Sequence, residues 1–322
     1  MPTAPQHREE LASQQLAHTL ESCIAPPPTR RGKVREIYER GDEVLLVATD
    51  RISAFDVILG TIPFKGATLT EQAVFWLEQA REVGPTHLLE RPEAQVMRVR
   101  RAVPFAFEFV VRGYLAGSLL REPAETRGEA WGLRLDPHQA PFTPFAAPLV
   151  TPTTKEAVGK HDLPSSLEAL KAKGVATQKQ LDEVRERALA LFALGSRAAR
   201  ERGLILVDTK YEFGLVGDEI VLIDEVHTAD SSRYWVASSY DERLAQGDPP
   251  EMLDKERLRR WLREERNFTG EGAPPALPDD VRIDLASFYW SLTETITGRD
   301  FAPDTGPVID RVTAVARGFL QS

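Results

Sequence analysis

The chain has 322 residues, 42% of them hydrophobic and 28% charged, a composition typical of a folded globular protein and not of a disordered chain. Its 40 Lys and Arg against 49 Asp and Glu residues give a net charge of -9, which argues against broad binding to nucleic acid or anionic lipid. The single cysteine, Cys23, allows no intrachain disulfide and no cysteine-based metal cage. The sequence contains no apolar run of membrane-span length and does not begin like a signal peptide, so we expect a cytoplasmic protein.

The first predicted region is a leader over residues 1–29. Residues 8–20 have the pattern of a short amphipathic helix, and three prolines at 26–28 end it and impose an extended linker. The sequence does not reveal what this leader does.

A β-rich N-terminal lobe is predicted over residues 30–113. KVREIYE and EVLLVAT form a hairpin, ATLTEQAVFWLEQA forms a helix on that sheet, and QVMRVRRA and FAFEFVVRGYL are two further strands. We expect Thr68 to cap the helix, with Glu71 at the capping-box position.

The second lobe is predicted over residues 114–322. The stretch 122–166 is rich in Pro, Thr and Gly and has no steady period, which is typical of a functional flap, whereas 178–202 is a strongly periodic helix. LILVDTKYEFGLV and EIVLIDEV form a hairpin, and helical patterns return at 254–266 and 308–320 with LASFYWSLTETITG between them. Two β-containing lobes with helices predict an α+β protein with a cleft for a ligand.

The first strand of this hairpin carries the richest chemistry. Strand alternation puts Asp208, Lys210 and Glu212 on one face. With a turn of three residues, Glu212 lies opposite Asp224, and paired carboxylates of this kind suit Mg²⁺. With a turn of two residues the carboxylates point to opposite faces, and a solvated polar face with a surface ion pair is the alternative to a metal site.

The segment Gly32-Lys33-Val34-Arg35 combines a glycine, for close approach of the backbone, with two cations that can grip a triphosphate. It is not the GxxxxGK[ST] phosphate loop, and plain surface charge is the alternative. Only nine of the 40 basic residues are lysines, so Lys33 and Lys210 stand out.

Further charged and hydroxyl residues occur at strand ends and near predicted cleft positions. Each also has an ordinary interpretation as a turn, a helix cap or solvated surface. The candidates are Asp50, Arg51, Ser53, Glu108, Arg112, Ser118, Arg233, Lys255 and Arg259. The sequence contains no Ser-His-Asp order, HExxH, CxxC or GxGxxG, so hydrolase, zinc and Rossmann interpretations have no support.

Seven segments together resemble the SAICAR synthetase family, also called phosphoribosylaminoimidazole-succinocarboxamide synthases. They are RGKVREIYE, LLVATDRISAFDVIL, IPFKGATLTEQAVFW, EFVVRGYLAGS, LILVDTKYEFG, LIDEVHTADSSRYW and LDKERLRRWL, covering about residues 30–265. The resemblance is closer to the longer, yeast-like form than to the short bacterial one. After Lys160 the sequence reads His161-Asp162-Leu163-Pro164 where the longer form has an HDEN-like run, so no role is carried onto it.

This resemblance implies an ATP-grasp-like fold of two lobes that hold ATP and Mg²⁺ in a cleft between them, with additional C-terminal helices. The implied reaction joins L-aspartate to 5-amino-1-(5-phosphoribosyl)imidazole-4-carboxylate, abbreviated CAIR, through an acyl phosphate, and releases ADP and phosphate. Another carboxylate-amine ligase, a small-molecule kinase and a silent nucleotide-binding protein are the alternatives. A monomer and a symmetric dimer are equally compatible with the sequence.

The resemblance also implies roles for the candidate residues. Lys33 and Arg35 contact the ATP phosphates, Glu212 and Asp224 bind magnesium, and Asp208 and Lys210 orient the imidazole substrate. The catalytic residues would be Lys210, Asp208 and Lys33. The substrate's phosphate and ring are bound by Arg112, Ser118 and Arg233, with a further contact from Lys255 or Arg259. Glu108 is a residue of the nucleotide cleft, and the aspartate candidates are Asp50, Arg51 and Ser53, of which the cation Arg51 suits a dicarboxylate best.

Overall fold

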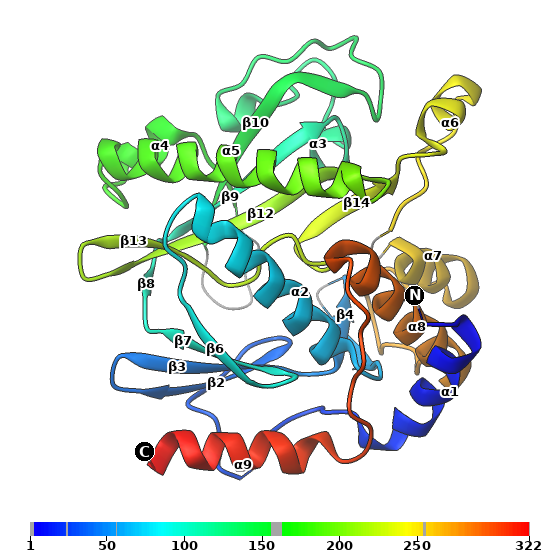
Figure 1. Cartoon of the computed structure of the whole chain (residues 1–322). Helices are drawn as coiled ribbons and strands as arrows, with labels where there is room; N and C mark the ends of the chain where they lie inside the picture. The colour runs from blue at the N-terminus through cyan, green and yellow to red at the C-terminus, as the bar shows by residue number, and fades with distance from the viewer. Residues whose placement is uncertain (1–2, 24, 56, 156–162, 254–255, 322) are drawn as a thin grey trace. The chain divides into compact units, whose positions relative to one another are not determined.

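The computed structural model describes the whole chain except residues 1–2, 24, 56, 156–162, 254–255 and 322, and the protein is a mixed α/β chain (Figure 1). It divides into two compact units. Unit 1 comprises Met1–Trp76, His87–Arg101 and Asp254–Ser322, and unit 2 comprises Leu77–Thr86 and Ala102–Leu253. The boundary expected near residue 113 lies inside strand β9 (Phe107–Tyr114), all of which belongs to unit 2.

Unit 1 is built on a five-stranded antiparallel sheet in the order β1-β2-β3-β7-β6. A separate hairpin joins β4 to β5. The strands span Arg30–Arg31 (β1), Arg35–Arg40 (β2), Glu43–Ala48 (β3), Arg51–Ala54 (β4), Val57–Thr61 (β5), Leu88–Glu93 (β6) and Val96–Arg100 (β7). The predicted hairpin of KVREIYE and EVLLVAT is thus confirmed as β2 and β3.

Helix α9 (Val308–Gln321) covers one face of this sheet (Figure 1). Its buried Val312 and Phe319 pack with Leu45 and Val47 of β3 in one hydrophobic cluster. Burying side chains of this size stabilises the unit by roughly 1.5–3 kcal/mol each.

Helix α2 (Lys65–Gln79) starts three residues before the predicted cap. Thr68 lies inside the helix, where its hydroxyl donates to the Lys65 carbonyl at 2.8 Å, so the predicted cap is wrong. The carboxylate of Asp50 accepts from the Gly66 N–H at 2.9 Å instead, and so satisfies a donor of the first turn that has no partner within the helix. A cap supplied by a distant residue leaves no local sequence pattern.

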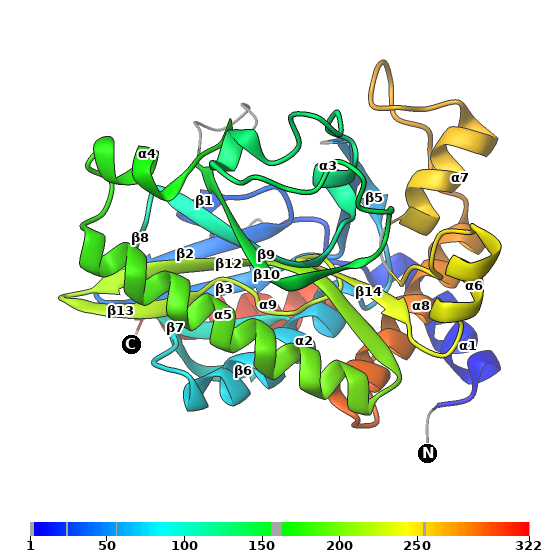
Figure 2. The same cartoon turned by 90° about the horizontal axis from the view of Figure 1, so that it is seen from above.

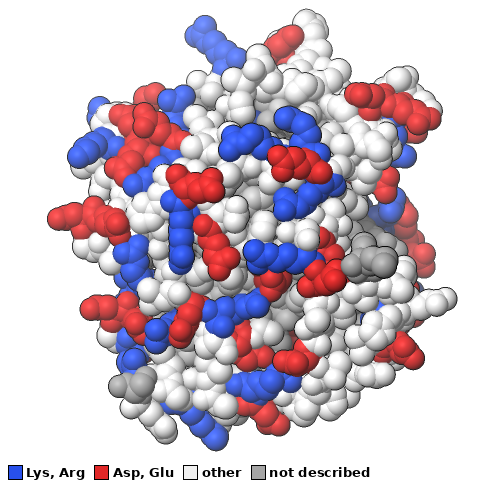
Figure 3. All heavy atoms as spheres, in the orientation of Figure 1, with Lys and Arg blue, Asp and Glu red and all other residues white. Residues whose placement is uncertain are grey.

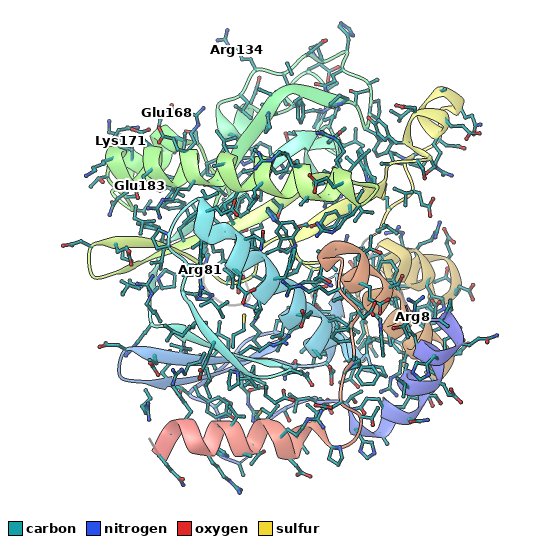
Figure 4. All side chains as sticks on the ribbon, in the orientation of Figure 1. Arg8, Arg81, Arg134, Glu168, Lys171 and Glu183 are labelled. Atoms are coloured by element: carbon teal, nitrogen blue, oxygen red, sulfur yellow. The ribbon has the colours of Figure 1, made fainter. Side chains whose placement is uncertain are left out.

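The predicted leader is docked onto unit 1. Helix α1 (Pro5–Gln15) and the 3-10 turn η1 (Leu16–His18) contact helix α8 (Asp279–Thr297). Arg8, labelled in Figure 4, lies 3.3 Å from a carboxylate oxygen of Glu294, and Gln15 exchanges hydrogen bonds with the backbone of Gly306. These contacts fix α1 to the rest of unit 1.

Unit 2 is built on a second antiparallel sheet, in the order β11-β10-β9-β12-β13, with β14 and β8 also paired to β12. Besides β9, the strands span Val103–Pro104 (β8), Pro144–Thr154 (β10), Leu163–Pro164 (β11), Leu204–Val216 (β12), Glu219–Ile223 (β13) and Ser232–Val236 (β14). The flap expected over 122–166 therefore contributes β10, a long strand of the sheet, although residues 156–162 lie outside the described part of the chain.

Helix α5 (Gln178–Glu201) runs along this sheet, beside β12 (Figure 2). Thr177 caps it in a capping box with Gln180, and the predicted face of Leu181, Val184 and Leu191 is buried. The helix ends just before Gly203, which adopts a positive φ, so the predicted span and stop are confirmed.

The remaining elements are short connecting helices and the C-terminal helices. They span Ala80–Glu82 (η2), Gly117–Leu120 (α3), Glu129–Trp131 (η3), Leu167–Ala172 (α4), Tyr240–Gln246 (α6) and Glu256–Arg266 (α7). Within the described residues, no helix is long and apolar enough to cross a membrane.

Candidate active site

Two arginines converge on one aspartate in the middle of the unit 2 sheet. Asp208 of β12 pairs with Arg112 of β9 on one side and with Arg233 of β14 on the other. Its Oδ2 atom lies 2.5 Å from Arg233 Nη1 and 3.6 Å from Arg112 Nη1. Arg112 also donates to the hydroxyls of Ser118, at 3.1 Å, and Thr151, at 2.9 Å. We call Asp208, Arg112, Ser118 and Arg233 the arginine cluster.

The arginine cluster is mostly buried and carries excess positive charge. Arg112 is 5% exposed and Asp208 4%, whereas the side chain of Arg233 is 28% exposed. Two guanidinium groups share one carboxylate, so the cluster favours an anion such as a phosphate ester. Gly117 has a φ of +61°, and a Cβ there would lie only 2.4 Å from Arg233 Nη1, so glycine is what lets Arg233 approach the chain.

A second cluster lies further along β12. The ammonium of Lys210 bonds a carboxylate oxygen of Glu212 and lies 3.3 Å from Glu108 Oε2 and 3.5 Å from Asp224 Oδ2. The ammonium of Lys155, directly after β10, bonds the other oxygen of Glu212. We call Glu108, Glu212, Asp224, Lys210 and Lys155 the carboxylate cluster.

The hairpin register differs from the one that the metal prediction required. Val216 pairs with Glu219, so the turn has the two residues Gly217 and Asp218, and Glu212 pairs with Ile223 and not with Asp224. That register should separate the two carboxylates. They still meet around Lys210 because β13 ends at Ile223 and Asp224 adopts a φ of +65°, outside the alternation of the strand.

Charge controls protonation in the carboxylate cluster. Burial raises the pKa of Glu212, but the Lys210 and Lys155 ammonium groups outweigh it and hold that pKa at about 2. Burial lowers the pKa of Lys210, and Glu212 and Glu108 outweigh this effect, so its pKa lies above the ordinary value. At neutral pH Glu212 is therefore ionised and bonds to the ammonium groups of Lys210 and Lys155.

The donor set of Glu212 and Asp224 fits Mg²⁺, which takes oxygen ligands and is usually held by one or two carboxylates together with phosphates. Across the described residues, no group of three or more His, Cys, Asp and Glu side chains is arranged to hold a metal ion. Glu212 and Asp224 could hold such an ion together with a phosphate ligand.

The loop between Asp224 and Arg233 is anchored by the buried side chain of His227. His227 is fully buried, its Nε2 lies 2.5 Å from the Tyr211 hydroxyl, and its carbonyl accepts from the Tyr234 hydroxyl at 2.7 Å. Burial lowers the pKa of His227 to about 3, so the ring is neutral. A neutral, hydrogen-bonded anchor holds the loop that connects the two clusters.

In unit 1, Gly32 to Arg35 form the turn between β1 and β2. The Gly32 N–H donates to the Arg35 carbonyl at 2.8 Å and closes the turn. Lys33 is exposed and Arg35 is half-buried, so the turn carries two cations at the end of a hairpin.

Comparison with known proteins identifies the family. The SAICAR synthetase family matches residues 28–275. The chain belongs to the SAICAR synthetase family. It is 41% identical over 289 residues to the phosphoribosylaminoimidazole-succinocarboxamide synthase of Legionella pneumophila (strain Lens), covering 88% of this chain and 92% of that protein. Over 306 residues it is 41% identical to the chloroplastic enzyme of Arabidopsis thaliana, covering 91% and 72% of the two chains.

A solved structure agrees. The SAICAR synthase from Saccharomyces cerevisiae, complexed with SAICAR, matches with a TM-score of 0.74 and 32% identity over 86% of this chain and 96% of its own. The predicted family and activity are thus confirmed: this SAICAR synthetase is a ligase that joins aspartate to CAIR in purine biosynthesis.

Lys155 is a member of the carboxylate cluster that sequence reasoning missed. It lies in the stretch 122–166, which has no readable period, directly before the residues that the structure does not describe. The scarcity of lysine in the sequence could have indicated Lys155 as a site residue, since it indicates Lys33 and Lys210 in the same way.

The aspartate candidates on and before β4 are held by the protein itself. Asp50 is fully buried and accepts from the N–H groups of Leu20, at 2.7 Å, and Gly66, at 2.9 Å. Arg51 is 7% exposed and donates mainly to backbone carbonyls. Ser53 is also buried. These contacts point to a scaffold role for Asp50 and Arg51.

Of the two candidates near helix α7, the structure describes only Arg259. Lys255 lies outside the described residues, and Arg259 lies half-buried on α7 of unit 1. On the face drawn in Figure 3, acidic and basic side chains are intermixed, with no broad field of one sign.

Proposed function

We propose that this SAICAR synthetase uses ATP to activate the carboxylate of CAIR as an acyl phosphate. A carboxylate oxygen attacks the γ-phosphorus, the bond between that phosphorus and the β,γ-bridging oxygen breaks, and ADP leaves. The amine of L-aspartate then attacks the acyl carbon, loses a proton and expels phosphate to leave the amide. The single observation that carries this proposal is the adjacency of the arginine cluster and the carboxylate cluster on β12.

The two clusters divide the work on the substrates. The arginine cluster binds the ribose phosphate and ring of CAIR through Arg112, Ser118 and Arg233, because two guanidinium groups exceed the charge of the one carboxylate between them. Asp208 orients the amino group of the imidazole, and the Lys210 ammonium holds the carboxylate that reacts. Arg259, and Lys255 before it, are proposed to assist at the substrate phosphate.

The carboxylate cluster and the turn 32–35 handle the nucleotide. Phosphoryl transfer needs positioning and neutralisation of charge more than covalent help. Lys33 and Arg35 contact the ATP phosphates, Glu108 lies on the nucleotide side of the carboxylate cluster, and Glu212 and Asp224 would hold Mg²⁺. The ion, when bound, neutralises charge on the phosphates. We assign Lys155 to the phosphates too, since it shares Glu212 with Lys210.

We further propose that the chain has the two-lobed, ATP-grasp-like fold that the family resemblance implies. The predicted aspartate pocket keeps Ser53 of β4 as its candidate, while Asp50 and Arg51 are committed to backbone contacts. The aspartate carboxylates then need a cation other than Arg51.

The proposal is tested by ADP release from the purified chain with ATP, Mg²⁺ and CAIR, comparing L-aspartate, L-glutamate, L-alanine and no amine. We expect ADP release that requires aspartate and a product with the mass of SAICAR. Turnover with another amine would indicate a related ligase, ADP release with no amine a kinase-like reaction, and nucleotide binding without turnover a silent binder. Each of these outcomes would contradict the proposal.

A further inference from the structure

Arg51 lies directly behind the turn formed by residues 32–35. Its Nε atom donates to the Lys33 carbonyl at 2.9 Å, and Nη2 donates to the carbonyls of Gly32, at 3.0 Å, and Arg35, at 3.5 Å. Thr49 donates to the remaining carbonyl of the turn, that of Val34, through both its N–H, at 3.0 Å, and its hydroxyl, at 2.8 Å. All four carbonyls of the turn therefore face the interior of unit 1.

The guanidinium of Arg51 has no donor left for a substrate. Its Nη1 atom donates to the Glu21 carbonyl and, at 2.7 Å, to Glu36 Oε1. Together with the three carbonyls of the turn, these acceptors match the five N–H donors of an arginine. Glu36 is fully buried, so it neutralises Arg51 inside the unit. The cation is therefore built into the scaffold.

The direction of the turn's carbonyls fixes the direction of its N–H groups. In a trans peptide the C=O and the following N–H point to opposite sides. Because the carbonyls of Gly32 and Lys33 both accept from Arg51, the N–H groups of Lys33 and Val34 both point away from that guanidinium. Two successive N–H groups of this kind form a concave site for an anion.

We propose that Arg51 is a positioning residue for ATP: it orients the peptide groups of the turn 32–35 so that their N–H groups and the Lys33 ammonium face the nucleotide phosphates. This inference rests on the proposed function, in which that turn contacts ATP. It replaces the interpretation of Arg51 as a ligand of the substrate aspartate.

The test compares Arg51→Lys with a matched control, Arg91→Lys, which changes an exposed arginine of the same unit paired with Glu71. Lysine keeps the charge but cannot span three carbonyls. We expect Arg51→Lys to raise KM for ATP at least tenfold and to leave KM for aspartate within twofold, while Arg91→Lys leaves both unchanged. A rise in KM for aspartate with ATP unaffected, or a fall in kcat alone, overturns the proposal.

Two further measurements keep the test decisive if Arg51→Lys does not fold. Glu36→Gln retains the shape but removes the counter-charge of Arg51, and we expect a smaller rise in KM for ATP, about threefold. In the unsubstituted enzyme, ADP should slow amide hydrogen exchange at residues 33–35 and leave the β6 edge, residues 88–93, unchanged. Unaltered exchange at 33–35 contradicts the inference.

A separate variant distinguishes failure of this inference from failure of the proposed function. Lys33→Met removes the cation of the turn and leaves the Lys33 carbonyl available to Arg51. If Lys33→Met weakens ADP binding and Arg51→Lys does not, only the role of Arg51 is wrong. If neither variant changes ADP binding, the assignment of the turn to the nucleotide fails as well.

Discussion

Unit 1 and unit 2 each contain a buried aspartate and arginine, but these side chains have different hydrogen-bond partners. The residues compared are Asp50 and Arg51 of unit 1 and the arginine cluster of unit 2. Around β4, the buried carboxylate and guanidinium bond mostly to backbone: Asp50 to two N–H groups and Arg51 to four carbonyls. On β12, Asp208 bonds to the guanidinium groups of Arg112 and Arg233. One region fixes the path of the chain, and the other gathers side-chain charge.

The comparison separates scaffold from site. A charged side chain that hydrogen-bonds to backbone groups cannot turn to a ligand without leaving those peptide groups unpaired, which costs about 1–3 kcal/mol for each group. A charge that bonds to other side chains can exchange them for a ligand of similar charge at little cost to the fold. Ionisable residues of the first kind should therefore affect stability, and those of the second kind should affect turnover.

The largest effect is expected from Glu212→Gln. The substitution keeps the size of the side chain but removes the charge shared by Lys210, Lys155 and the proposed Mg²⁺. We expect kcat to fall by about a thousandfold, as for the loss of other transition-state charge partners. Thermal unfolding should change by only a few degrees. The matched control is Glu186→Gln on the exposed face of α5, where no change in kcat is expected.

Arg233→Lys should weaken substrate binding without stopping chemistry. Lysine cannot reproduce the forked contact of a guanidinium with a phosphate, and such a loss corresponds to about 1–3 kcal/mol. We expect KM for CAIR to rise roughly tenfold to a hundredfold, with KM for ATP unchanged. Initial rates at varied CAIR measure this, and a rise confined to ATP would place Arg233 in the nucleotide site.

Asp50→Asn should lower the stability of the protein and leave its kinetic constants unchanged. The asparagine side chain can accept from only one of the two N–H groups that Asp50 satisfies, and its own NH₂ faces the other. We expect a loss of about 1–3 kcal/mol in the free energy of unfolding, with kcat and all KM values within twofold at a temperature where the variant is folded. Urea unfolding and initial rates test this together; unchanged stability with a raised KM for aspartate would restore Asp50 to the site.

The last prediction concerns the pH dependence of stability. Burial raises the pKa of Asp50 to about 6, although the N–H groups of Leu20 and Gly66 oppose the shift. The unfolded chain loses this proton near pH 4 and the folded chain keeps it until about pH 6, so this residue lowers stability as pH rises through that window, by about 2–3 kcal/mol at most. Asp50→Asn has no titrating carboxyl at this position, so its stability should lack this fall with pH. Urea unfolding at pH 4 and pH 6.5 measures the difference: the free energies of unfolding of the variant and the wild type should lie closer together at pH 6.5 than at pH 4.

Much of the fold could be predicted because its signals are local. The period of α5, its cap at Thr177 and its stop at Gly203 all lie within one stretch of sequence, as do the β2–β3 and β12–β13 hairpins. The start of α2 could not be predicted, since Asp50 supplies its cap from outside the helix. Strand β10 also went unrecognised because its proline-rich and threonine-rich sequence lacks alternation.

The candidate site was predicted unevenly for the same reason. Alternation along β12 was enough to group Asp208, Lys210 and Glu212. The structure brings Arg112 and Arg233 to Asp208, and Arg112 bonds to Ser118. The approach of Asp224 to Lys210 depends on a positive φ directly after β13. An aspartate can adopt such a φ, but the presence of an aspartate does not predict it. The contacts of Arg51 could not be predicted, because the sequence gives no sign of the backbone carbonyls that surround it.

The central claim is that the β12 clusters serve an acyl phosphate made from CAIR. The most direct measurement uses CAIR labelled with ¹⁸O in its carboxylate, together with ATP, Mg²⁺ and L-aspartate, and determines the mass of the inorganic phosphate released. Transfer of one labelled oxygen to phosphate for each SAICAR formed is the predicted result. Unlabelled phosphate formed alongside labelled SAICAR would contradict the account, because the carboxylate oxygen would then never have been bonded to phosphorus.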